Sequence, residues 1–224
     1  MYKNISLSAQ IFEKLETDIL FGVYPKGEIL TEIKLSESLG VSRTPVREAL
    51  KMLEQEHLIE DCGKGMKVLG ITLEDAISIY EIRKRIEGLA AGRCAVSATD
   101  AQLQELKETV DLQEFYLQRG DSGKVKEQDS QFHELIYKYS GSAVLYDTLL
   151  PLHRKIQKFR KTAVEKRSRA DQSVAEHKSI LKALMERDPL KAEQLMDEHT
   201  ENAQFRLTEL YQPSERKEDG NGTY

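Results

Sequence analysis

The 224-residue sequence has no long apolar run, few cysteines and no excess of positive charge. No stretch approaches the roughly 20 apolar residues that a membrane-spanning helix needs, and the amino-terminal MYKNISLSAQ lacks the apolar core of a signal peptide. The two cysteines, Cys62 and Cys94, have neither disulfide-framework nor metal-ligand spacing. We therefore expect a cytoplasmic protein that does not associate with membranes.

The charge balance is acidic overall and also at the amino-terminal end. The net charge is −5, and residues 1–70 hold nine lysines and arginines against eleven aspartates and glutamates. Because no basic field covers the molecule, any contact with nucleic acid must depend on a local patch. The hydrophobic content of 39% is sufficient for a core in one large or two small domains.

Residues 31–58 carry the signals of two short helices joined by a tight turn. Thr31 is expected to cap the first helix, which ends at Gly40. Ser42 is expected to cap the second, with Pro45 in its first turn. One face of the second helix is apolar at helical spacing, through Val46, Ala49, Leu50 and Leu53.

The exposed start of this second helix carries Arg43, Thr44, Arg47 and Glu48. A recognition helix inserts this end into the major groove of DNA. The planar fork of an arginine can donate two hydrogen bonds to guanine O6 and N7. Thr44 and Glu48 suit contacts with phosphate, a thymine methyl group or a cytosine amine.

Two short strands are expected next, at Leu58–Asp61 and Met66–Leu69. The turn between them carries Gly63, Lys64 and Gly65, which predicts a wing that approaches the DNA backbone. With a helix near residues 8–22, residues 1–70 are predicted to form a winged helix-turn-helix domain. Since one copy offers few phosphate contacts, we expect a homodimer that binds an inverted-repeat operator in double-stranded DNA.

The segment LSESLGVSRTPVREALKMLEQEHLIE, followed by GKG, resembles the DNA-binding domain of the GntR superfamily of bacterial transcription regulators. By this resemblance Arg43 and Arg47 correspond to base-reading arginines and Thr44 to a phosphate or base contact. Residues 63–65 correspond to the tip of the wing.

From residue 71 onward the pattern is that of helices alone, and the fold class is mainly α. Thr72 and Asp75 form a capping box at the start of the first of these helices. Six helices are expected, near residues 72–96, 99–120, 122–139, 142–164, 168–187 and 189–211. Residues 71–211 are predicted to form an all-α antiparallel bundle, and residues 212–224 a disordered tail.

Four side chains of this second domain suit a shared metal ion. Asp129 and His133 stand one helical turn apart, and His177 and His199 lie on the two last helices. One carboxylate and three imidazoles fit Zn²⁺, with Ni²⁺, Mn²⁺ or Fe²⁺ also compatible. The alternative is that these are ordinary core or surface histidines.

The second domain also resembles the FCD ligand-binding domain of the FadR-type branch, and its six helices resemble the smaller VanR-like subgroup. Metal-binding members carry Asp-x-x-x-His on one helix and one histidine on each of two later helices, which implies Asp129, His133, His177 and His199 here. His153 does not match this pattern and is expected on the surface of the bundle, while His57 belongs to the first domain.

An ion with open positions suggests an effector pocket for a small carboxylate metabolite. Arg83 is the candidate partner for that carboxylate, although an ion pair with Glu87 one turn later is equally compatible. Asn202 could add a hydrogen bond, and Arg206 is a weaker candidate. The basic segment Lys155–Arg169 is read as a solvated face.

The leading hypothesis is a metabolite-responsive transcription regulator and not an enzyme. Two alternatives stay open: a metal-dependent enzyme acting on a small acid, with Glu134 or Glu198 as base, and a regulator whose metal is purely structural.

Overall fold

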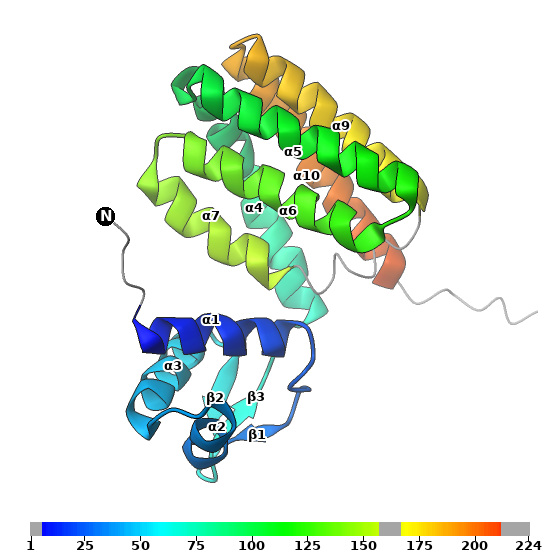
Figure 1. Cartoon of the computed structure of the whole chain (residues 1–224). Helices are drawn as coiled ribbons and strands as arrows, with labels where there is room; N and C mark the ends of the chain where they lie inside the picture. Colours follow the sequence, from blue (N-terminus) through cyan, green and yellow to red (C-terminus); the bar gives the residue numbers. More distant parts are fainter. Residues whose placement is uncertain (1–5, 157–166, 212–224) are drawn as a thin grey trace, which may run out of the picture. The chain divides into compact units, whose positions relative to one another are not determined.

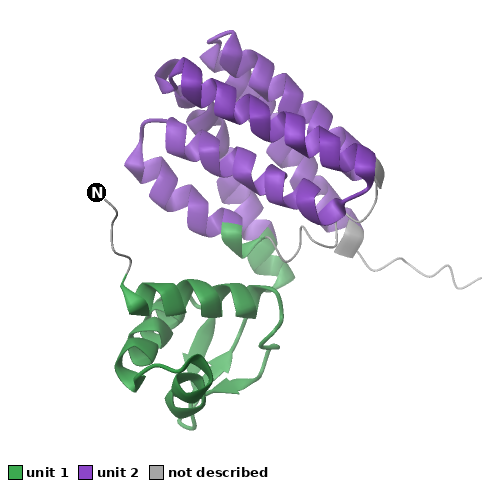
Figure 2. Ribbon diagram, in the orientation of Figure 1, with its two compact units in different colours: residues 1–76, 154–158 green, residues 77–153, 159–224 purple. Residues whose placement is uncertain are grey.

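The computed structural model describes residues 6–156 and 167–211, which divide into two compact units. The first unit contains residues 6–76 with 154–156, and the second contains residues 77–153 with 167–211 (Figure 2). Within the described residues, no helix is both long and apolar enough to cross a membrane.

The first unit is a helix-turn-helix with a small antiparallel sheet (Figure 1). Its elements are α1 (Leu7–Leu20), β1 (Ile29–Leu30), α2 (Glu32–Leu39), α3 (Arg43–Gln55), β2 (Ile59–Asp61) and β3 (Met66–Val68). The buried face of α3 is the predicted one and packs with Leu15, Ile19 and Leu35. This packing fixes α3 so that its opposite face, with both arginines, is exposed.

The helix ends agree with the expected caps, with one difference. The Thr31 hydroxyl accepts a hydrogen bond from the Lys34 backbone N–H, and Gly40 is left-handed at φ 66°. Ser42 occupies the cap position of α3, but within the described residues its side chain makes no cap hydrogen bond. The start of α3 therefore keeps an uncapped set of backbone N–H groups beside the exposed Ser42.

The wing has three strands, in the order β1-β3-β2, where the sequence predicted two. β1 pairs with β3 through Ile29↔Lys67 and Leu30↔Met66. The sequence expectation missed β1 because two residues are too short to show alternating hydrophobicity. β1 joins the wing hairpin to the segment that leads into α2.

The second unit is a helical bundle, as predicted (Figure 1). Its helices are α4 (Leu73–Ser97), α5 (Asp100–Arg119), α6 (Ser122–Tyr139), α7 (Ala143–Lys155), α9 (Arg167–Met185) and α10 (Pro189–Tyr211). The Thr72–Asp75 capping box is present at the start of α4. The fourth helix was expected to reach Val164, and residues 157–166 lie outside the described part, as do most of the basic segment and the predicted tail.

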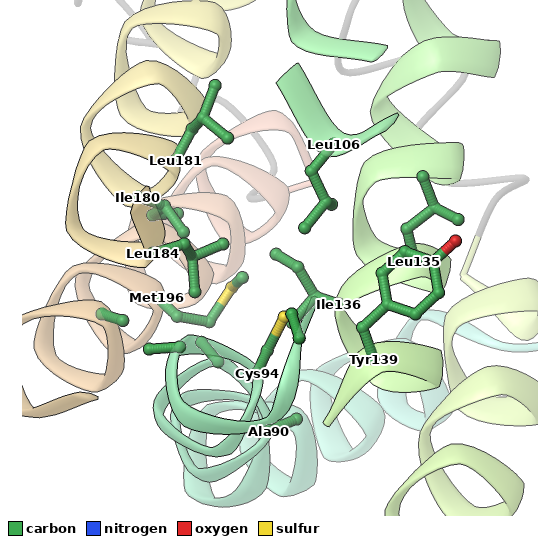
Figure 3. Packing of buried hydrophobic residues seen from close by; sticks show 14 of the residues in the cluster. Ala90, Cys94, Leu106, Leu135, Ile136, Tyr139, Ile180, Leu181, Leu184 and Met196 are labelled. Atoms are coloured by element: carbon green, nitrogen blue, oxygen red, sulfur yellow. The ribbon is translucent and has the colours of Figure 1, made fainter. Parts of the chain in front are cut away.

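The core of the bundle is built from apolar residues on α4, α5, α6, α7, α9 and α10. Figure 3 shows Ala90 and Cys94 of α4 facing Ile136 of α6 and Met196 of α10. α5 packs against α6 and α9, and α9 packs against α10. Burial raises the pKa of the Cys94 thiol to about 12, so this cysteine is an inert core residue. The core positions α6, α9 and α10 so that their histidines meet.

Candidate metal centre and nucleic-acid interface

Three of the predicted histidines meet inside the bundle. His133 of α6, His177 of α9 and His199 of α10 are all buried, and one nitrogen of each lies within 4.8 Å of the others. The Nε2 atoms of His133 and His199 are 3.2 Å apart. Asp129 lies beside them, with Oδ1 3.7 Å from His177 Nε2. The structure thus brings all four predicted ligand side chains together.

Two further side chains orient the imidazole rings. His177 Nδ1 lies 2.8 Å from Gln113 Oε1, and His199 Nδ1 lies 2.7 Å from Glu176 Oε2. Because an amide oxygen and a carboxylate only accept hydrogen bonds, each Nδ1 carries the hydrogen. In the neutral rings the Nε2 lone pairs of His177 and His199 are therefore free of hydrogen and face the cluster, which is the tautomer that a metal ligand requires.

Asp129 is held by hydrogen bonds from two other helices. Ser173 Oγ donates to Asp129 Oδ1 at 3.0 Å, and Gln113 Nε2 donates to the same oxygen at 3.5 Å. Gln113 therefore links the carboxylate of α6 with His177 of α9. Sequence patterns did not indicate Gln113, Ser173 or Glu176. Glu176 directly precedes His177 in the sequence, whereas nothing local marks Gln113.

The electrostatics favour neutral histidines and charged carboxylates. Burial lowers the pKa of His133 to about 3, and burial also lowers the pKa of His199 although Glu176 opposes the shift. Burial alone would raise the pKa of Glu176, but the hydrogen bond from His199 and the charge of Arg169 lower it to about 2. At neutral pH His133 and His199 are therefore unprotonated, the form in which an imidazole binds metal ions.

The donor set and its spacing fit a tetrahedral ion. Nitrogen ligands at ~2.0–2.1 Å from Zn²⁺ lie about 3.3–3.4 Å from each other in a tetrahedron. The 3.2 Å separation of His133 Nε2 and His199 Nε2 is close to this value. The three imidazoles and the Asp129 carboxylate could therefore hold a borderline divalent ion such as Zn²⁺.

Arg83 is paired with Glu87, the alternative that the sequence left open. Its Nε and Nη2 donate to Glu87 Oε1 at 3.0 and 2.7 Å, and both side chains are buried. Glu87 also accepts from Thr200 Oγ1 at 2.7 Å and from Tyr137 Oη. Burial alone would raise the pKa of Glu87, but Arg83 and His133 lower it well below its usual range. The ion pair is therefore fully charged inside the bundle.

His133 faces both this pair and the metal-ligand cluster. Its Nδ1 lies 3.7 Å from Glu87 Oε1, while its Nε2 faces His199. Within the described residues, Nδ1 makes no hydrogen bond. The ring of His133 thus lies between the other candidate ligands and the Arg83–Glu87 pair.

His153 is buried, so its predicted surface position is wrong. Its ring lies 5.1 Å from the ring of His133, and Nδ1 is 3.5 Å from Tyr137 Oη. The reason is its helical spacing, since Leu149, Leu150 and Ile156 lie on the same face of the segment and are buried. The expectation of a surface position rests only on the mismatch of His153 with the family's metal-binding pattern and does not use this spacing.

A small cavity of about 30 Å³ adjoins the cluster. It is lined by ten residues: Tyr80, Arg83, Asp129, His133, Arg169, Ser173, His199, Thr200, Ala203 and Arg206. This volume holds about one or two waters, and the charged groups of its wall are three arginines and Asp129. Asn202 does not line it; its Nδ2 donates instead to Glu176 Oε1 at 2.9 Å.

The predicted base-reading residues lie on the exposed side of the first unit. Arg43, Thr44, Arg47 and Glu48 are all exposed on α3. A groove of about 580 Å³ lies between this face and the wing, and its basic lining residues are Arg43, Arg47, Lys51 and Lys64. The two predicted parts of the interface, helix and wing tip, therefore border one concave surface.

The wing tip depends on two glycines. Gly63 and Gly65 have φ values of +75° and +142°, and the Gly63 N–H donates to Asp61 Oδ1 at 2.8 Å. A Cβ atom at Gly65 would lie 2.6 Å from the backbone oxygen of Leu30. The turn is thus closely packed against β1 and presents the exposed Lys64 at its tip.

Glu32, at the start of α2, contacts both predicted base-reading arginines. Arg47 donates from Nε and Nη2 to its two carboxylate oxygens at 2.6 and 2.8 Å, and Arg43 Nη2 donates at 3.0 Å. The hydrogen bonds from Arg47, together with Arg43, lower the pKa of Glu32 to about 2. These contacts leave no local pattern in the sequence, because the partners are 11 and 15 residues apart.

Comparison with known families gives two matches. Residues 7–67 match the gntR family of bacterial regulatory proteins, and residues 78–202 match the FCD domain. The histidine cluster lies within the second match and the α3 face within the first.

Several curated relatives are similar over most of the chain. The HTH-type transcriptional repressor RspR of Escherichia coli is 27% identical over 207 residues, covering 92% of this chain and 91% of RspR. The gluconate operon transcriptional repressor of Bacillus subtilis is 24% identical over 211 residues, covering 92% and 87% of the two chains. Among solved structures, McbR/YncC of Escherichia coli shares the fold, with a TM-score of 0.79 at 22% identity over 93% of this chain and all of McbR/YncC.

Proposed function

This chain belongs to the GntR family of bacterial regulatory proteins with an FCD domain, and from that premise we propose that it is a metal-dependent, metabolite-responsive regulator that binds an inverted-repeat operator as a homodimer. That it is a transcription regulator of the GntR/FCD type follows from its family. The relatives named above are transcription regulators, which favours a regulator over an enzyme.

For DNA binding, we assign base reading to Arg43 and Arg47, and backbone contacts to Thr44 and the wing tip. The support is the exposure of these side chains beside a groove that continues to Lys64. Glu48 lies one turn after Thr44 on α3, and we assign it a base or phosphate contact. Two copies are needed because the acidic balance of residues 1–70 leaves few phosphate contacts in each.

The metal proposal depends above all on one observation: the Nε2 atoms of His133 and His199 are 3.2 Å apart, and both rings are buried. Asp129, His133, His177 and His199 are the proposed ligands, and Zn²⁺ is the ion that best fits them, with Ni²⁺, Mn²⁺ and Fe²⁺ compatible. A bound ion supplies positive charge and open coordination positions. Gln113, Ser173 and Glu176 hold the ligands in place.

We assign the cavity beside the cluster to a small carboxylate effector. Arg83, Arg169 and Arg206 supply the positive charge that recognises such a group. Glu87 occupies the Nε donor and one Nη2 donor of Arg83, so a carboxylate that binds Arg83 must either use the remaining Nη1–Nη2 edge or replace Glu87. The cavity must also enlarge, since about 30 Å³ cannot hold a metabolite. Asn202 acts through Glu176 in this assignment, as a positioning residue for His199.

The proposal is tested with the purified full-length chain. Native mass spectrometry should show a dimer with one metal ion per chain, and selection from a random duplex library should yield a sequence with two-fold symmetry. Addition of small di- and tricarboxylates should then change affinity for that duplex in a metal-dependent way. A recovered site without two-fold symmetry would overturn the dimeric operator, and metal-dependent turnover of an acid would favour the enzyme. Metal binding without any effect of acids on DNA affinity would favour a purely structural ion.

A further inference from the structure

Glu32 is the one side chain of α2 that bridges both arginines of the α3 face. Its carboxylate accepts two hydrogen bonds from Arg47 and one from Arg43. The two arginine side chains are 54% and 57% exposed, so their charged groups project from the surface while Glu32 holds them from behind. Because Glu32 belongs to a different helix, the bridge also ties α2 to the start of α3.

The geometry leaves the base-reading edge of Arg47 available. Glu32 occupies Nε and one Nη2 hydrogen, while both Nη1 hydrogens and the other Nη2 hydrogen remain. A guanine takes two N–H groups of one fork, and the Nη1–Nη2 edge provides them. The same carboxylate therefore does not compete with guanine; it fixes the plane and direction of the fork that meets the base.

The bridge also changes how the arginines attract phosphate. One negative charge between two guanidiniums lowers the charge of this patch, and non-specific DNA affinity depends on such charge. In water an exposed pair of this kind contributes little, but once DNA excludes water the same contacts strengthen. Glu32 thus weakens non-specific contacts of the arginines with phosphate and stabilises the ordered, dehydrated complex.

We propose that Glu32 is a positioning residue for sequence recognition. It orients Arg43 and Arg47 and lowers their non-specific affinity for DNA. This inference rests on the proposed function, in which the two arginines read bases. Ordering a long side chain before binding is worth roughly 2- to 10-fold in affinity for each side chain. Loss of the carboxylate should therefore reduce the ratio of specific to non-specific affinity by about 10-fold.

The test compares Glu32→Gln with Glu37→Gln in the full-length dimer. Glu37 is exposed on the same helix, so its replacement makes the same change in net charge at a distance from the arginines. Fluorescence anisotropy is measured with the selected operator and with a scrambled duplex, from 50 to 200 mM salt. For Glu32→Gln we expect tighter binding to the scrambled duplex, a salt slope steeper by about 1, and a specificity ratio about 10-fold lower. Glu37→Gln should keep the wild-type ratio.

A ratio for Glu32→Gln within about two-fold of that of Glu37→Gln would overturn the inference. Arg47→Ala separates this failure from failure of the proposed function. If Arg47→Ala lowers the ratio and Glu32→Gln does not, only the positioning role is wrong. If Arg47→Ala leaves the ratio unchanged, Arg47 does not read a base, and the base-reading role that the proposed function gives it is wrong. Glu32→Asp, which keeps the charge, should recover part of the ratio, and circular dichroism confirms that each variant is folded.

Discussion

Gln113 Oε1 accepts a hydrogen bond from His177 Nδ1 at 2.8 Å, so a neutral amide on α5 sets the direction in which an imidazole on α9 presents its other nitrogen. The same amide reaches Asp129 of α6 through Nε2. One side chain therefore controls the orientation of two proposed ligands on two other helices.

Gln113→Leu should lower metal affinity by about 10- to 100-fold, because the variant keeps the side-chain volume but frees the His177 ring to rotate. The measurement is a competition titration of Zn²⁺ against a chromophoric chelator. Gln104→Leu, at an exposed position of α5, is the matched control and should bind the ion like the wild type. Equal affinities of the two variants would remove Gln113 from the support of the site.

His177→Ala should reduce the metal content of the purified protein while leaving basal DNA binding largely unchanged, because the ring packs against Phe132 and His199 inside the second unit, whereas the α3 face belongs to the first. Elemental analysis gives the metal content per chain. The control is His57→Asn at an exposed histidine whose φ of 57° asparagine tolerates. Full metal occupancy in His177→Ala would show that His177 is not a ligand.

The metal-free protein should lose stability as the pH falls from 6.5 toward 5. Burial lowers the folded-state pKa of His133 to about 3 and lowers that of His199, whereas both are near 6.5 in the unfolded chain. Below pH 6.5 the unfolded state therefore binds more protons than the folded state. Each histidine then lowers the free energy of unfolding by up to ~1.4 kcal/mol per pH unit. Urea unfolding at several pH values across this range gives the slope of the free energy of unfolding against pH. His133→Gln should flatten it, and an unchanged slope would contradict the assignment.

Gly65→Ala should destabilise the first unit by about 1–3 kcal/mol, because a side chain at φ +142° is strained and its Cβ would collide with the Leu30 backbone oxygen. The measurement is the free energy of unfolding in urea. Gly123→Ala is the control, since its Cβ would meet its nearest neighbour at 3.5 Å. We expect that change to be neutral or slightly stabilising. Equal effects of the two substitutions would mean that the close packing of the wing turn on β1 is unimportant.

Arg47→Ala should weaken operator binding by about 1–3 kcal/mol and relax the preference at one base pair in each half-site. Gel shifts with the operator and with each single-base variant of it measure both effects. Lys34→Ala, on the exposed face of α2, serves as a control for the loss of one positive charge. Unchanged operator affinity in Arg47→Ala would exclude the arginine from recognition.

Local patterns predicted the elements well. The Thr31 cap and Gly40 bound α2 as expected, and α6 begins and ends at the predicted Ser122 and Tyr139. The spacing of Asp129 and His133 placed both on one buried face of that helix. Such features depend on residues within a few positions of each other, so a sequence displays them directly.

The remaining features depend on contacts between distant residues. Gln113 meets His177 across 64 positions, and Glu32 meets Arg47 across 15, so neither pairing leaves a periodic signal. The wrong position for His153 has another cause, since it follows from a mismatch with the family's metal-binding pattern, although the apolar spacing around His153 is visible in the sequence. The choice between Arg83 as an effector ligand and as the partner of Glu87 required the burial of both side chains, which no spacing reveals.

The two nitrogens of His133 have different surroundings, and this has a consequence for its hydrogen. His199 Nδ1 keeps its hydrogen on Glu176, so in the neutral pair His133 Nε2 must be the donor to His199 Nε2, and a lone pair of His133 then faces Glu87. An ion bound at Nε2 would reverse this tautomer and place an N–H against the Glu87 carboxylate. Occupancy by the ion would thus weaken the hold of Glu87 on Arg83. Arg83 lies in α4, the helix that begins at Leu73, five residues after the last strand of the wing ends at Val68.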